Sequence, residues 1–99
     1  MAKYELPIYG ENDEIVKTYQ TDLVRYGILE DALAIQENLN TMQPREQINQ
    51  INSIIQRVFK GLTIEELHDA DLGDVRNLFN QIISISDKAT TNKTVNQKN

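Results

Sequence analysis

Residues 59–67 read Phe59-Lys60-Gly61-Leu62-Thr63-Ile64-Glu65-Glu66-Leu67, and this stretch decides the fold because one helix ends and the next begins within it. Gly61 can adopt the left-handed backbone conformation that ends a helix at little energetic cost. Thr63 and Glu66 have the spacing of a capping box, in which each side chain accepts a hydrogen bond from a free backbone N–H of the following helix. The stretch therefore predicts a helical C-terminal half, with Gly61, Thr63 and Glu66 as capping residues.

Two amphipathic helices are predicted before this stretch, over about 23–41 and 44–60, because apolar residues recur there at spacings of three and four. Pro44 suits the first turn of the second helix, where its missing N–H costs nothing. The short break favours an antiparallel pair, and we expect most apolar positions to be core. They are Ile28, Leu29, Ala32, Leu33, Ile35, Leu39 and Met42 in the first helix, and Ile48, Ile51, Ile54, Ile55, Val58 and Phe59 in the second.

Two further helices are predicted after Gly61. A short one runs over about 64–70, and Asp71 can then cap a longer one over about 72–87. The apolar stripe of this last helix is Val75, Leu78, Phe79, Ile82 and Ile83. Residues 88–99 hold one sizeable apolar side chain, Val95, so we predict a disordered polar tail there.

The N-terminal residues predict a β-hairpin at about 3–19. Tyr4, Leu6 and Ile8 alternate with polar residues, a turn follows at 10–13, and residues 14–19 are β-prone. A two-stranded ribbon is marginal alone, so it must pack on helices or pair with a strand of another chain. The fold class is mainly α (α+β): a hairpin packed on three longer helices plus one short helix, with residues 1–87 as a single compact domain.

Composition and charge narrow the class of protein. The chain has 99 residues and no cysteine, which fits a reducing cytoplasm. Seven of the ten Lys and Arg residues and all fifteen Asp and Glu residues lie in 1–87, giving that part a net charge of −8. An acidic body repels phosphate backbones, so we expect no nucleic-acid partner. No apolar run approaches the roughly 20 residues that cross a bilayer, so we expect no membrane partner.

The sequence predicts no catalytic, cofactor-binding or metal-binding residue. His68 lies among Glu65, Glu66, Asp69 and Asp71, but a zinc site needs three or four nitrogen or sulfur ligands and this chain offers one His and no Cys. The acidic group is better explained as a solvated helix start favoured by the helix dipole. Ser53, Ser84 and Ser86 have no local nucleophile–base signature.

Four tyrosines, Tyr4, Tyr9, Tyr19 and Tyr26, lie in and near the hairpin. An apolar ring with a polar tip suits either packing between hairpin and helices or a self-association or partner surface. Both interpretations stay open from the sequence. We also expect a homo-oligomer, because three apolar stripes are many for so short a chain.

The chain resembles the phage tail assembly chaperones of siphophages and prophages of Gram-positive bacteria over most of residues 2–87. The resemblance is carried by the stretches KYELPIYG (3–10), RYGILEDALAIQE (25–37), VFKGLTIEEL (58–67) and LFNQII (78–83). It implies a non-enzymatic protein of the bacterial host cytoplasm that binds the tape measure protein, keeps that apolar rod in solution, and leaves as the tail tube polymerises.

The resemblance also implies a longer product, because in many such systems ribosomes slip near the end of the gene. Gln97-Lys98-Asn99 can be encoded as CAA AAA AAC, which contains a slip-prone heptamer. We therefore hypothesise that a frameshifted longer form of the protein is a further partner, a hypothesis that the codons of the gene test.

Two other functions are open from the sequence. A small phage or host regulator could use a helix-turn-helix-like segment over 63–83, although that segment holds only one basic residue, Arg76. A generic helical adaptor for another coiled-coil protein is the second alternative.

Overall fold

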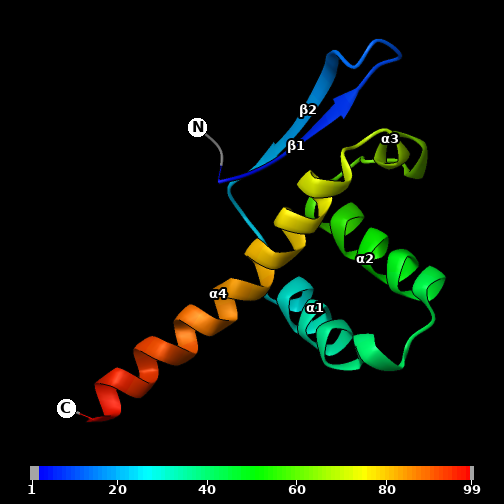
Figure 1. Ribbon diagram of the computed structural model, residues 1–99. Coiled ribbons are helices and arrows are strands. Elements are labelled where there is room, and N and C mark those ends of the chain that lie inside the picture. The colour runs from blue at the N-terminus through cyan, green and yellow to red at the C-terminus, as the bar shows by residue number, and fades with distance from the viewer. Residues whose placement is uncertain (1–2, 99) are drawn as a thin grey trace.

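The computed structural model describes residues 3–98, with side chains up to Ile85. It shows an N-terminal antiparallel hairpin packed against three longer helices and one short helix, as the sequence predicts. In Figure 1 the hairpin lies at one end, α1 and α2 lie beside the N-terminal half of α4, and the last turns of α4 extend beyond the other elements.

The hairpin consists of β1(Tyr4–Tyr9) and β2(Ile15–Thr21). Leu6 pairs with Tyr19 and Ile8 with Lys17, and the register shifts by a bulge between Ile8 and Tyr9. The alternation places the side chains of Tyr4, Leu6 and Ile8 in the core. The predicted hairpin is therefore confirmed, and its second strand continues two residues further than expected.

Residues of the α3–α4 connection and of α4 stabilise the hairpin at β1. The Tyr9 N–H donates to the Asp69 carbonyl at 3.0 Å, and Ile8 forms an isolated bridge with Ala70. Gln81 of α4 donates through its side-chain amide to the Lys3 carbonyl at 3.0 Å. These bonds supply the support that an isolated two-stranded ribbon lacks.

The helical pair consists of α1(Tyr26–Asn38), a 3₁₀ turn at Leu39–Thr41, and α2(Pro44–Val58). The helix α1 begins three residues later than expected, since Thr21 first forms a turn through hydrogen bonds between its side-chain oxygen and Leu23. Pro44 starts α2, as predicted. The helix ends before Phe59, whose backbone is extended and whose ring is buried.

The short helix α3(Ile64–His68) ends two residues earlier than expected, because Ala70 leaves the helix to pair with Ile8. The last helix, α4(Leu72–Lys98), starts where the sequence predicts. Its first turn is capped by Asp71, whose Oδ2 accepts a hydrogen bond from the Asp74 N–H at 3.1 Å.

The helix α4 ends later in the chain than the sequence predicts. The sequence places the helix end near Asp87 and a disordered tail over 88–99, whereas the backbone is helical through Lys98. Residues 74–98 contain neither glycine nor proline, so nothing interrupts a helix in which each added residue forms one more hydrogen bond. Asn99 lies outside the described residues.

The core draws side chains from both the hairpin and all four helices. Its fully buried members include Leu6 of β1, Ile54 and Ile55 of α2, and Ile82 of α4. The amphipathic stripes thus meet in one core cluster. Two predicted core residues are exceptions: the side chain of Ile48 is 58% exposed, and the half-buried Leu33 lies outside the core cluster.

Candidate functional site: an apolar groove between α2 and α4

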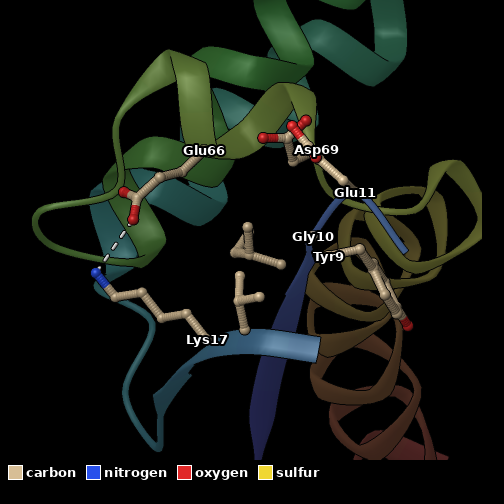
Figure 2. A pocket seen from close by; sticks show the side chains of 8 residues that line it. Tyr9, Gly10, Glu11, Lys17, Glu66 and Asp69 are labelled. Carbon is tan, nitrogen blue, oxygen red and sulfur yellow. Dashed lines mark hydrogen bonds and ion pairs between the residues drawn. The ribbon is translucent and has the colours of Figure 1, made fainter. Parts of the chain in front are cut away.

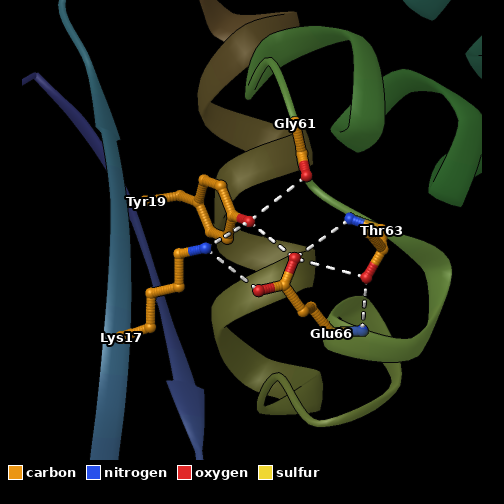
Figure 3. Close-up of polar contacts among 5 residues, drawn as sticks. All are labelled: Lys17, Tyr19, Gly61, Thr63 and Glu66. Atoms are coloured by element: carbon orange, nitrogen blue, oxygen red, sulfur yellow. Dashed lines mark hydrogen bonds and ion pairs between the residues drawn. The ribbon is translucent and has the colours of Figure 1, made fainter.

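The capping residues lie as the sequence predicts. Thr63 Oγ1 accepts a hydrogen bond from the Glu66 N–H at 3.1 Å, and Glu66 Oε1 accepts one from the Thr63 N–H at 3.2 Å (Figure 3). Gly61 has φ of 89°, the left-handed conformation expected after α2. These residues shape the chain between α2 and α4.

The capping carboxylate also binds the hairpin. The Tyr19 hydroxyl lies 2.6 Å from Glu66 Oε1, and the Lys17 ammonium donates to Glu66 Oε2 at 3.1 Å (Figure 3). Hydrogen bonds from Tyr19, the Thr63 N–H and Lys17 lower the pKa of Glu66 to about 2. Hydrogen bonds with Tyr19 and Glu66 raise the pKa of Lys17. This network holds β2 against α3 and is structural.

A small hollow of about 450 Å3 lies beside this network, between the hairpin turn and α3. In Figure 2 the Lys17 ammonium reaches across it to the Glu66 carboxylate. Glu11 and Asp69 also line the hollow. The one cation of its lining is already paired and the other charges are carboxylates, so we assign it no ligand.

The four tyrosines do not form one surface. Tyr4 is in the core, and the half-buried ring of Tyr19 packs against Phe59 with ring centroids 6.1 Å apart. Tyr9 is half-buried, and desolvation followed by the charges of Asp74 and Asp71 raises its pKa. Tyr26, at the start of α1, is 74% exposed. Packing against the helices therefore accounts for Tyr4 and Tyr19, whereas a self-association or partner surface that includes Tyr9 and Tyr26 stays a prediction.

A groove of about 1230 Å3, larger than the hollow beside the hairpin turn, lies between α2 and the α3–α4 segment, with the end of α1 closing one side. Its lining includes Ile48 and Ile51 from α2, and Leu72, Val75 and Phe79 from α4. These residues repeat at intervals of three or four, so each helix turns an apolar row toward the groove. Ile48 is 58% exposed and Leu72 is 69% exposed.

The exposure of Ile48 corrects the sequence prediction that its stripe is core. The helix α2 carries an apolar face of five residues, and the half of that face near Val58 is buried while the half near Pro44 lies in the groove. The spacing in the sequence identifies this wide apolar face but does not show which part of it another helix covers. Leu72 gave little indication of a groove in the sequence, because it is a single apolar residue next to the capping residue Asp71.

His68 is exposed and lines the same groove from the end of α3. Among the side chains that the structure describes, no three His, Cys, Asp or Glu are arranged to hold a metal ion. Within the described residues, no helix is both long enough and apolar enough to span a bilayer.

No family model, curated protein or solved structure matches the chain significantly.

Proposed function

We propose that the protein is a non-enzymatic phage tail assembly chaperone that binds the tape measure protein in the cytoplasm of the bacterial host. The proposal joins the sequence resemblance to one structural observation, the groove with Ile48 and Leu72 exposed in it. An open groove lined by two apolar helix rows is the kind of surface on which an amphipathic helix lies.

The groove suits a helix better than a small molecule. Pockets for small molecules enclose most of their ligand and have volumes of roughly 300–1,000 Å3, whereas this groove of about 1230 Å3 is larger and leaves Ile48 and Leu72 exposed. Covering the exposed parts of Ile48 and Leu72 would contribute on the order of 1 kcal/mol each. Affinity from one groove is therefore modest.

A modest affinity of each groove for its partner helix suits a chaperone that must later be released from that partner. Many copies along one long helical rod would hold it by avidity, and arriving tube subunits would displace them one at a time. The net charge of −8 on residues 1–87 would keep the coated rod from aggregating. Self-association and a frameshifted longer form belong to the same proposal, since both would add copies to the coat.

Co-expression with the tape measure protein encoded beside its gene tests the proposal. The wild-type protein should move that protein from the insoluble to the soluble fraction. The variant Ile48→Gln/Leu72→Gln should lose most of this effect, because glutamine removes the apolar surface without changing the charge. The matched control Ile15→Gln/Leu23→Gln alters residues that are 57% and 59% exposed but do not line the groove, and it should act like wild type.

An unchanged solubility of the tape measure protein in the presence of the wild-type chain would reject the chaperone function. Equal loss in the groove variant and in the control would reject the groove as the binding site.

A further inference from the structure

The groove has a charge opposite to that of the rest of the chain. None of its lining residues is Asp or Glu, although the chain has fifteen of these residues. Two of the four arginines, Arg45 and Arg76, line it together with the single histidine, His68. A helix entering the groove would therefore meet an apolar floor beside cationic side chains.

The two arginines stand on opposite walls. Arg45 is in the first turn of α2, whereas Arg76 is in the second turn of α4, and both are exposed. Among the described side chains, neither forms an ion pair, since the two ion pairs there are Lys17–Glu66 and Arg57–Asp31. Both guanidinium groups are thus available to a carboxylate of a partner.

The carboxylates nearest in sequence to the α4 wall are committed elsewhere. Asp69 lines the hollow on the hairpin side, Asp71 accepts the hydrogen bond that caps α4, and Asp74 in the first turn of α4 is outside the groove lining and acts on Tyr9. The positive charge of the groove is therefore not cancelled within its own lining.

We propose that the groove selects an amphipathic helix whose apolar stripe is flanked by Asp or Glu on both sides. The apolar rows would supply most of the affinity, and Arg45 and Arg76 would supply the selectivity by pairing with carboxylates on either flank. That this helix belongs to the tape measure protein rests on the proposed function; the charge preference itself rests on the lining of the groove.

The overall charge of the chain predicts the opposite preference between an acidic and a basic helix. A net charge of −5 on the chain attracts a basic helix and repels an acidic one. Preference for an acidic helix would therefore have to come from local contacts with the groove.

Two synthetic helical peptides test this preference. They share their length, capped ends and a leucine stripe, and they differ only in carrying Glu or Lys on both flanks of the stripe. Fluorescence anisotropy measures their binding to the full-length protein at about 0.05 M and roughly 0.5 M salt, where screening lengths differ several-fold. The Glu-flanked peptide should bind about fivefold more tightly at low salt, and the ratio should shrink at high salt.

Two double variants separate local from overall charge. Arg45→Glu/Arg76→Glu should reverse the preference. Arg25→Glu/Lys60→Glu changes the net charge by the same amount at exposed residues outside the groove, and it should keep the wild-type order of the two peptides. Circular dichroism of each variant verifies that the helices are intact.

The inference would be overturned if the wild type preferred the Lys-flanked peptide, bound both peptides equally or bound neither. It would also be overturned if both double variants responded in the same way. So would self-association that the groove variant Ile48→Gln/Leu72→Gln abolishes, since a second copy would then occupy the groove. Solubilisation of the tape measure protein without the Glu preference would leave the chaperone function standing and remove this inference. A preference for the Glu-flanked peptide without solubilisation would leave this inference standing and reject the chaperone function.

Discussion

The hydroxyl of Tyr19 lies 2.6 Å from Oε1 of Glu66, so a side chain of β2 is hydrogen-bonded to the carboxylate that caps α3. The same carboxylate oxygen accepts from the Thr63 N–H in the capping box. A local helix cap and a contact between residues 47 positions apart therefore share one acceptor. We expect the hairpin and α3 to lose their structure together.

Tyr19→Phe should lower the midpoint of urea unfolding and raise the pKa of Glu66 from about 2 toward its ordinary 4.5. Phenylalanine keeps the ring that packs against Phe59 and removes only the hydroxyl. Urea titration and NMR titration of the Glu66 carboxyl group measure the two effects. Tyr26→Phe, at a ring that is 74% exposed, is the matched control and should change neither.

The free energy of unfolding should fall as the pH is lowered from 4.5 to 2, because the Glu66 carboxylate becomes protonated in this range. Its pKa is lower in the folded chain, about 2, than the ordinary 4.5, so its contribution is fully present above pH 4.5 and is lost as the pH falls toward 2. Comparing the free energy of unfolding of wild type and Glu66→Gln across this window isolates the contribution. The difference between them should narrow as the pH falls, and a constant difference would contradict the lowered pKa.

Two glycine substitutions should have opposite effects. Gly61→Ala should destabilise the fold by about 1 kcal/mol because φ is 89°, although a Cβ there would meet nothing within 4 Å. Gly27→Ala in α1 should stabilise it by about 0.5 kcal/mol, since its Cβ would have one neighbour, Arg57 Nη2, at 3.8 Å. Thermal unfolding measures both, and shifts of the same sign would contradict the backbone argument.

The purified protein should not shift random duplex DNA in a gel at low salt. Residues 1–87 carry a net charge of −8, and a regulator would need several cations on its recognition helix, where the segment 63–83 has only Arg76. A salt-dependent shift would favour the helix-turn-helix-like regulator instead.

Local signals in the sequence were sufficient for most elements of the fold. Pro44 starts α2, Gly61 follows it in the left-handed conformation, and Thr63 with Glu66 forms the capping box. Each depends on residues within one turn of each other, so spacing alone predicts it. The hairpin followed from alternation for the same reason.

What the sequence did not predict depends on contacts between distant residues. The network of Tyr19 with Glu66 and the bridge of Ile8 with Ala70 have no local pattern. The groove also could not be predicted, because whether Ile48 is core or surface depends on how far α4 extends over α2. Periodicity identifies an apolar face but not what covers it.

The most direct measurement of the proposal that the groove binds a tape measure helix is an NMR titration of the ¹⁵N-labelled protein with a helical segment of the proposed tape measure partner. Amide shifts should concentrate on Ile48, Ile51, Leu72 and Val75, and they should be lost in Ile48→Gln/Leu72→Gln but retained in Ile15→Gln/Leu23→Gln. Shifts confined to the hairpin, or no shifts at a saturating excess of the segment, would contradict the claim.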